Sequence, residues 1–465
     1  MAVTMVKSSV GTGVLALPYA FARGGLLSTS LTLVLLAAWN EFCGLRLIAC
    51  VGLLSPEERR RYERESPLEA LARAALGSRG ATAVEGIFLT LVFGVTTSYL
   101  VAAHDTVNLG RRGLFVAAAL SLPLTCVSDV GKLAPAAVLG LVALGACFAI
   151  TVFYCLVQKT RGDGSPRLYS GTPRAWASGF GVLSFCFGLV PIVPQFANSM
   201  REPRDFPVAQ RTSLAATVVI YLCLGILVAC LDPNVPGNVL YELPSTTAAL
   251  AARCTVGLVC VASAPLPVVA GADIVEKRFK SFSPLKSSSS SSKSTKNYSK
   301  NSTSSSTTFL ATDSEAQAEA GGAFAAEGRN SLLHFFFGFL VRASILFGAA
   351  FVAYFVPEFA VVVSVVGAAT VSFLSFVLPP LIHLRLLRRR SESFLETTTS
   401  PVAAKDDAKV RRSAVIVDLV AVVLGAVVVL FATSLVTADA VASFRRGGAK
   451  ATSIQEDSEQ RQISS

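Results

Sequence analysis

Residues Val6–Phe21 read V-K-S-S-V-G-T-G-V-L-A-L-P-Y-A-F, an apolar stretch with two glycines around Thr12. A helix that unwinds inside a bilayer leaves N–H and C=O groups without partners, so such breaks persist only where they line a cavity enclosed by protein. A half-helix beginning beside Gly13 would turn free N–H groups and its positive dipole end toward the membrane centre, where they suit a carboxylate. The stretch predicts a broken first helix at a binding site, and a Gly-rich packing face is the alternative interpretation.

A second interruption lies at the matching place in the other half of the chain. Residues 179–194 read G-F-G-V-L-S-F-C-F-G-L-V-P-I-V-P, and Gly188 and Pro191 lie three residues apart. Proline has no N–H to donate, so the helical ladder is weakened here. Phe185 and Phe187 flank the break, either as walls of a pocket or as ordinary packing residues. Paired interruptions in two corresponding segments are typical of transporters built from inverted repeats, with the solute bound between the breaks.

The composition indicates a polytopic membrane protein. Of the 465 residues, 52% are hydrophobic and 15% are charged, and the mean hydropathy is +0.58. Soluble domains carry about 25% charged residues. A membrane-spanning helix needs about 17–25 residues that are mostly apolar. We expect eleven such spans, near residues 5–26, 29–54, 84–104, 113–130, 134–157, 175–198, 212–231, 248–272, 341–357, 359–383 and 413–437.

These spans predict an all-α membrane protein that forms a single transporter domain over residues 1–465. The two breaks, in spans one and six, favour a five-plus-five inverted repeat. The first repeat is expected at 5–157 and the second at 175–383, followed by an eleventh helix at 413–437. Residues 281–328 are Ser-rich at first and then rich in Ala, Glu and Gly. They hold too few apolar side chains to fold, so we expect a disordered loop.

Charge and cysteine placement narrow the function classes. The net charge of +11 is explained by basic clusters such as Arg59–Arg61 and Arg388–Arg390 rather than by nucleic-acid binding. With the N-terminus in the cytosol, these clusters follow the positive-inside rule. The ten cysteines all lie in apolar spans, where they are expected to be small buried residues without disulfides or metal ligation. Motifs for metal, phosphate or nucleophilic chemistry are missing from the sequence, which argues against an enzyme and against a cofactor.

Ionisable side chains inside lipid are costly, by about 2.5–3.5 kcal/mol on insertion scales, so each is a candidate functional group. Glu41 is the deepest acidic residue and our candidate proton carrier. Lys7, one turn before the first break, is either a coupling residue or a lysine that extends to the cytosolic interface. The pair His104-Asp105 is either an interfacial pair or a gate. Charged residues near cytosolic span ends are expected to be anchors: Glu85, Asp273, Arg342, His383, Arg385 and Asp418.

At both breaks the chain resembles the amino acid/auxin permease family. The similar stretches are Val10–Phe21 in span one, Gly94–Asp105 in span three, Phe185–Pro207 in span six and Val365–Leu384 in span ten. The resemblance implies an eleven-span LeuT-like fold and the transport of amino acids.

The resemblance also implies a set of residues that contact an amino acid. These are Ser8, Gly11, Thr12, Gly13, Tyr99, Phe187 and Gly188. Backbone groups of the first break would hold the carboxylate and the amine, and the sixth-span residues would bound the side-chain end. The tyrosine would reach the site from the third span.

Two departures from the family pattern bear on coupling. Many relatives carry His or Glu beside the sixth-span break, where this chain has Gly188-Leu189-Val190, so the contact made by those groups is in question. Sodium-coupled relatives typically have Asn at the position of Lys7. Because an ammonium group cannot bind Na⁺, the resemblance favours proton coupling or facilitated exchange.

Two functions follow from these observations. The first is secondary active transport of amino acids, a symport with protons by alternating access around the broken helices. The second is an amino-acid sensor that signals through its cytosolic loops, with the Ser-rich segment as its support. Both imply an amino-acid partner and a lipid bilayer, and neither implies nucleic acid. The plasma membrane and a vacuolar or lysosomal membrane are both compatible with the sequence.

Overall fold

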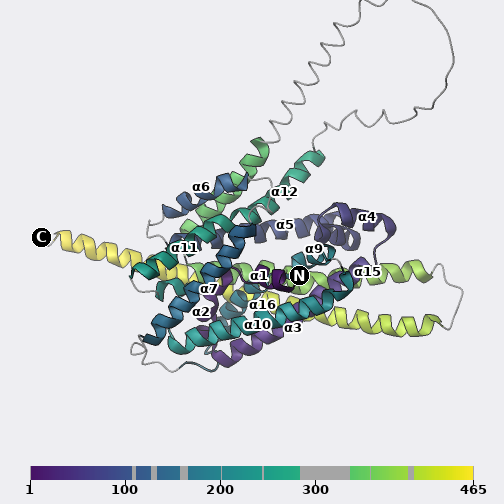
Figure 1. The fold of residues 1–465 in the computed structure, drawn as a ribbon, viewed down its shortest axis with the longest axis horizontal. Coiled ribbons are helices and arrows are strands. Elements are labelled where there is room, and N and C mark those ends of the chain that lie inside the picture. Colours follow the sequence, from purple (N-terminus) through teal and green to yellow (C-terminus); the bar gives the residue numbers. More distant parts are fainter. Residues whose placement is uncertain are drawn as a thin grey trace, which may run out of the picture.

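The structure is a computed structural model, and it describes residues 2–106, 112–126, 134–157, 166–200, 202–242, 246–282, 336–356, 358–395 and 403–463. Within these ranges the chain forms helices joined by turns and no strand. The helices pack side by side in one bundle (Figure 1). Eight helices in the described residues are long and apolar enough to cross a membrane, so the chain is a multi-pass membrane protein, as predicted.

The helices of the first half, in chain order, are α1 (Ala2–Ser9), the 3₁₀ segment η1 (Thr12–Ala16), α2 (Leu17–Gly24), α3 (Leu26–Val51), α4 (Pro56–Arg64), α5 (Pro67–Thr106), α6 (Gly113–Thr125) and α7 (Ala134–Val157). The second half begins with α8 (Pro173–Cys186), η3 (Val190–Ile192), α9 (Val193–Asn198), η4 (Pro203–Asp205), α10 (Phe206–Leu231), η5 (Val239–Glu242), α11 (Thr247–Ser263) and α12 (Pro265–Phe282). An apolar helix over Phe336–Phe355 follows. The last elements are α14 (Phe359–Val366), the π-helical segments η6 (Gly367–Val371) and η7 (Phe373–Val377), α15 (Leu378–Leu395) and α16 (Ala403–Ile463).

The eight candidate spans coincide with expected spans two, three and six to eleven. Expected spans four and five correspond to two shorter apolar helices, Gly113–Thr125 and Leu144–Phe153. The first expected span is divided between α1, η1 and α2, which is why no single long helix is found there. The number of eleven spans and the inverted repeat stay predictions.

Several helix boundaries differ from those expected, each for a local reason. Helix α5 begins at Pro67 rather than near residue 84, because a second helical segment precedes the expected span and joins it through a kink at Gly77, where φ is +73°. The expected eighth span is two helices, α11 and α12, divided before Pro265, which lacks a backbone N–H. Helix α12 extends to Phe282, just into the expected Ser-rich loop, and the rest of that loop lies outside the described residues.

The core lies where α2, α8 and α10 pack together, and α8 also packs against α14 and η6. Fully buried side chains there include Phe21, Phe187 and Tyr221. Large hydrophobic side chains are exposed on the outer faces, for example Leu31 on α3 and Val420 on α16. Such a surface is unusual for a soluble protein and suits lipid contact.

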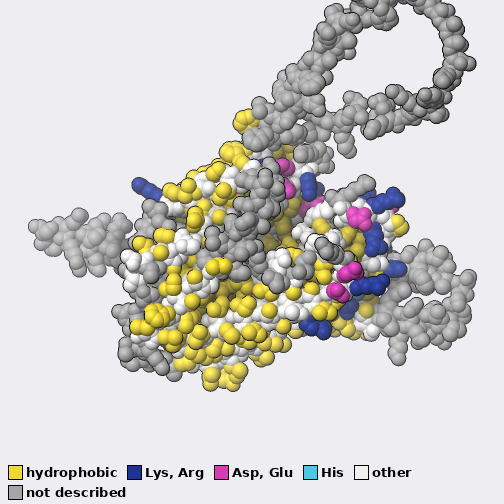
Figure 2. Space-filling model, viewed as in Figure 1, with side chains coloured by type: hydrophobic (Ala, Val, Ile, Leu, Met, Phe, Trp, Pro, Cys, Tyr) yellow, Lys and Arg dark blue, Asp and Glu magenta, His cyan; other side chains and the backbone are white. Residues whose placement is uncertain are grey.

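Charged side chains gather at one end of the bundle. Figure 2 shows an apolar middle, with Lys, Arg, Asp and Glu concentrated at the end where Figure 1 places α4 and α9. The N-terminus belongs to the same end, because Met5 of α1 packs in one cluster with Val193 and Ala197 of α9. The basic clusters at Arg59–Arg61 and Arg388–Arg390 lie together at this end, since Arg389 pairs with Glu58, and their cytosolic orientation stays a prediction.

The expectation that all cysteines are buried is wrong for four of the nine that the structure describes as free thiols. The exposed ones are Cys126, Cys223, Cys230 and Cys254. They lie in apolar helices, where an outward-facing thiol meets lipid rather than water, so the sequence pattern alone does not separate the two environments.

Candidate functional site

The first helix is interrupted at Val10 and Gly11, as predicted. Helix α1 ends at Ser9, Gly11 is extended with φ −114° and ψ −162°, and η1 begins at Thr12. The first N–H of η1 to form a hydrogen bond of the 3₁₀ type is that of Val14. It donates to the carbonyl of Gly11, 3.2 Å away. The N–H groups of Thr12 and Gly13 therefore come before the first internal hydrogen bond, which is the arrangement that suits an anionic group.

The sixth helix is also interrupted, between α8 and α9. Helix α8 ends at Cys186, Phe187 leaves helical geometry with φ −97° and ψ 22°, and the short η3 precedes α9. Proline at position 191 cannot donate to the helical ladder, so the chain continues as a 3₁₀ turn. Both breaks expected from the sequence are present.

Tyr221 of α10 joins the two breaks. Its side chain is fully buried, and its hydroxyl oxygen lies 2.7 Å from the carbonyl oxygen of Ser9 and 3.1 Å from that of Cys186. These carbonyls lie at the ends of α1 and α8, where a helix terminus leaves carbonyl groups without helical partners. The Ser9 carbonyl also accepts from the Gly11 N–H at 3.0 Å. A hydroxyl has a single hydrogen and donates to one of the two carbonyls at a time. The aromatic ring also packs edge-on against Phe187, with centroids 5.6 Å apart.

The backbone of the first break lies close to side chains at the end of α8. A Cβ atom placed on Gly13 would lie 2.8 Å from Cδ1 of Phe185 and 2.9 Å from Sγ of Cys186. Only glycine therefore allows η1 to approach α8 this closely. Gly11 differs, since a Cβ atom there would meet nothing within 4 Å. The free space beside Gly11 leaves its backbone open to a small solute.

The other residues expected to contact the solute differ in where they lie relative to the two breaks. Phe187 is fully buried against Tyr221, and Gly188 lies in the turn that follows. Tyr99 is half-buried against the main core on α5, a helix that packs against η1. The hydroxyl of Ser8 is exposed and donates to the Thr4 carbonyl of its own helix, 3.0 Å away.

The two expected coupling residues are not brought to the breaks by any described side-chain contact. Glu41 forms an ion pair with Arg211, 2.8 Å away, and the Arg211 side chain is 72% exposed. Arg211 precedes Tyr221 by ten residues on α10, about 15 Å along the helix axis. Glu41 therefore lies nearer the charged end of the bundle than the breaks. Lys7 belongs to α1, but its side chain lies outside the described part of the structure.

A buried charged group links three helices, although two of its members were expected to be anchors at span ends. Asp418 of α16 is fully buried, with Nδ1 of His383 at 2.5 Å and Nε of Arg46 at 3.0 Å. Buried ions in a membrane protein are stable only when paired in this way. The three residues lie far apart in the sequence, so no spacing could have indicated their contact.

The described residues hold no group of three or more His, Cys, Asp or Glu side chains that could bind a metal ion. At the breaks themselves, a solute would meet backbone N–H and C=O groups and the apolar side chains that pack around them.

Comparisons with known proteins agree with this geometry. A family model described as transmembrane amino acid transporter protein matches residues 1–405. Amino acid transporter ANT1 of Arabidopsis thaliana is 25% identical over 82% of this chain and 83% of its own length. Vacuolar amino acid transporter 3 of Schizosaccharomyces pombe is 22% identical over 59% of this chain and 42% of its own length. The vesicular inhibitory amino acid transporter of Xenopus tropicalis is 22% identical over 82% of this chain and 68% of its own length.

Proposed function

The chain belongs to the transmembrane amino acid transporter family, and from this premise we propose that it carries amino acids by proton-coupled secondary transport. The family and the names of its relatives indicate a transporter rather than an enzyme, as expected. We propose a LeuT-like fold of eleven spans, with repeats at 5–157 and 175–383 and an additional helix at 413–437. The cytosolic end would open and close around the two breaks by alternating access.

One observation carries this proposal: two interrupted helices meet at a single buried hydroxyl, that of Tyr221. A zwitterion needs hydrogen-bond donors for its carboxylate and acceptors for its amine. The N–H groups of Thr12 and Gly13 offer the donors, and the carbonyl group that ends α8 offers an acceptor through its second lone pair. Gly11, with free space beside it, gives access to the backbone. We assign the site to these groups together with Ser8, Tyr99, Phe187 and Gly188.

Proton coupling rests on separate grounds. Relatives are named as vacuolar and vesicular transporters. A proton gradient across the membrane of such a compartment can drive a proton-coupled transporter. Lys7 stands where sodium-coupled members of the family have Asn, and an ammonium group cannot bind Na⁺. We propose Lys7 and Glu41 as coupling residues. Glu41→Gln is expected to remove the proton dependence of uptake, and an unchanged pH profile would exclude Glu41 from coupling.

Reconstitution in liposomes tests the function. We expect uptake of at least one of the twenty radiolabelled amino acids to rise when an inward proton gradient is imposed. Absence of gradient-dependent uptake for all of them would refute the proposal. Thermal stabilisation by an amino acid without any flux would favour the sensor instead.

A further inference from the structure

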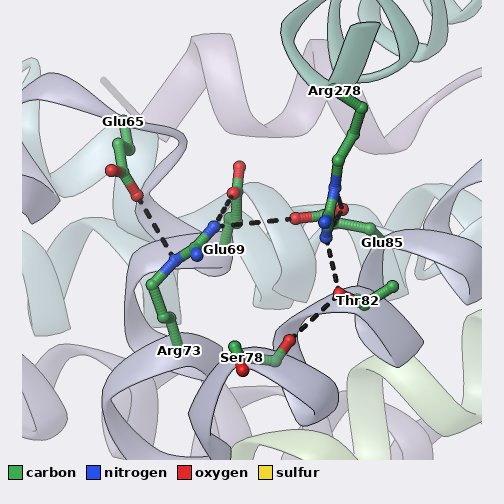
Figure 3. Close-up of polar contacts among 7 residues, drawn as sticks. All are labelled: Glu65, Glu69, Arg73, Ser78, Thr82, Glu85 and Arg278. Carbon is green, nitrogen blue, oxygen red and sulfur yellow. Dashed lines mark hydrogen bonds and ion pairs between the residues drawn. The ribbon is translucent and has the colours of Figure 1, made fainter. Parts of the chain in front are cut away.

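A network of charged side chains lies at the cytosolic end of α5. Figure 3 shows Arg73 between Glu65 and Glu69, and Arg278 of α12 against Glu85 and Thr82. Arg73 Nη2 lies 2.5 Å from Glu69 Oε1, and Arg278 Nη2 lies 2.5 Å from Glu85 Oε2. The network therefore connects both parts of α5 with α12.

The kink at Gly77 makes this network possible. Glu69 and Glu85 are sixteen residues apart, about 24 Å along a straight helix. With Gly77 at φ +73°, the first part of α5 turns back and brings Glu69 beside Glu85. A conformation with φ this positive is easily adopted only by glycine.

The network, as formed by the described residues, lacks one positive charge. It contains three carboxylates and two guanidinium groups, which leaves one negative charge without a partner. The shortage falls on Glu85, whose side chain is only 7% exposed. Its Oε2 is held by Arg278, whereas no described donor hydrogen-bonds to its buried Oε1. Arg73 Nη2 lies 4.0 Å from Oε1, and that guanidinium is already bound to Glu69. Burying an unpaired carboxylate is costly.

Glu69 and Glu85 both approach Nη2 of Arg73, which lies 2.5 Å from Glu69 Oε1 and 4.0 Å from Glu85 Oε1. Two carboxylates this close repel each other when both are ionised, and a proton on one of them removes the repulsion. That proton would also supply the missing charge. Neither Arg73 nor Arg278 can release a proton in this range, because guanidinium groups stay charged.

The two carboxyl groups line a small cavity beside the second break. Its volume is about 40 Å³, enough for a water molecule, and Pro191, Ile192 and Gln195 also line it. Glu69 and Glu85 are the charged residues of this lining. From α12 the charged neighbour is Arg278, since Glu276 is paired with Arg342 at 3.1 Å. The carboxyl pair thus adjoins the part of the sixth helix that would move.

We propose that Glu69 and Glu85 form a proton-binding pair at the cytosolic end of the transporter. With one proton bound, the network is neutral and the segments around the cavity stay packed. When this end opens, water enters, the O–H bond breaks, and the proton passes to water, which leaves two carboxylates that repel each other. The proposal rests on the proposed transport function and adds the residues that hold a proton.

Neutral isosteric variants test the pair in proteoliposomes supplied with a pool of the twenty radiolabelled amino acids. A gradient of one pH unit can concentrate a solute about tenfold if one proton moves with it. We expect Glu85→Gln and Glu69→Gln to exchange amino acids without a gradient. Imposing the gradient should leave their uptake almost unchanged, with a ratio near one. Glu57→Gln, at an exposed glutamate of α4 outside the network, is the control and should keep the stimulation of the unmodified protein.

Infrared spectroscopy gives a readout that does not depend on transport. The purified protein at neutral pH should show a protonated-carboxyl band that Glu69→Gln and Glu85→Gln lose and Glu57→Gln keeps. The proposal is overturned if both variants keep the gradient response, or if the band is the same in all four proteins. If no amino acid is transported, the transport function fails and the infrared result alone decides the proton site. If Glu85→Gln aggregates, the same comparison is made with Glu69→Gln.

Discussion

The hydroxyl of Tyr221 lies 2.7 Å from the carbonyl oxygen of Ser9, at the point where the first helix stops. The same oxygen is 3.1 Å from the carbonyl of Cys186, where the first part of the sixth helix stops. One hydroxyl of α10 is therefore within hydrogen-bonding distance of the ends of two interrupted helices. Any movement of α1 relative to α8 must change this contact, so Tyr221 is a residue at which the two breaks are mechanically linked.

Removing only the hydroxyl tests this link. Tyr221→Phe keeps the ring that packs on Phe187 and removes the hydroxyl donor shared by the Ser9 and Cys186 carbonyls, of which the Ser9 carbonyl keeps the Gly11 N–H at 3.0 Å. The expected loss of unfolding free energy is about 1–3 kcal/mol. Thermal unfolding of the purified protein measures it, and amino-acid exchange in liposomes should fall as well. Tyr169→Phe, at an exposed tyrosine, is the control. A Tyr221→Phe protein as stable and active as the control would show that the contact is dispensable.

The two glycines of the first break should respond differently to alanine. Gly11→Ala adds a methyl group into free space, at backbone angles that other residues adopt, so thermal stability should stay close to that of the unmodified protein. If the backbone there binds the solute, exchange of amino acids should drop at least tenfold, about 1.4 kcal/mol of binding. Unchanged exchange by Gly11→Ala would remove this backbone from the site.

Gly13→Ala is expected to destabilise the protein through a steric clash. Its Cβ would lie 2.8 Å from Phe185 and 2.9 Å from Cys186, closer than carbon atoms pack. We expect a cost of about 1–3 kcal/mol in stability, seen as a lower unfolding temperature. Equal stability of Gly11→Ala and Gly13→Ala would contradict the close approach of η1 and α8.

The buried carboxylate of Asp418 should depend on Arg46. Arg46→Met leaves Asp418 with His383 as its one remaining partner in this contact, and breaking a buried ion pair costs about 3–5 kcal/mol. Arg211→Met removes an exposed pair with Glu41 and should cost no more than about 1 kcal/mol. Unfolding temperatures of both variants in one detergent provide the comparison. A larger drop in unfolding temperature for Arg211→Met than for Arg46→Met would contradict the assignment of the Asp418 pair as buried and the Glu41 pair as exposed.

A pH-dependent contribution is expected from Glu58, which lies in the first turn of α4. Its carboxylate accepts from the Ser55 N–H at 2.9 Å and pairs with Arg389 of α15 at 2.5 Å. Partial burial acts to raise the pKa of Glu58, but these hydrogen bonds outweigh it and hold that pKa below its usual value. A lowered folded-state pKa stabilises the protein above the ordinary glutamate pKa of about 4.3, and the stabilisation is lost as pH falls through the folded-state value.

Thermal unfolding as a function of pH checks this expectation. Glu58→Gln should unfold at a lower temperature than the unmodified protein at neutral pH, and the difference should shrink in acid. Glu57→Gln, an exposed neighbour in the same turn, serves as the control and should show no such trend. A difference that grows in acid would contradict the sign of the pKa shift.

The sequence by itself determined that the chain lies in a membrane and that helices one and six are interrupted. Both follow from local chemistry: long apolar runs must leave water, and Gly or Pro weakens the helix in which it stands. The identity of the family could also be predicted, because its motifs are made of those same residues.

Only the tertiary structure decided which side chains serve the breaks and which charges meet. Tyr221, Asp418 and Glu85 each lie in apolar runs that show no sign of a partner. Their partners come from other helices or from beyond a kink, so the pairing depends on how helices pack in three dimensions. Helical periodicity reports which face of a helix is apolar, but it carries no information about the neighbour that this face will meet.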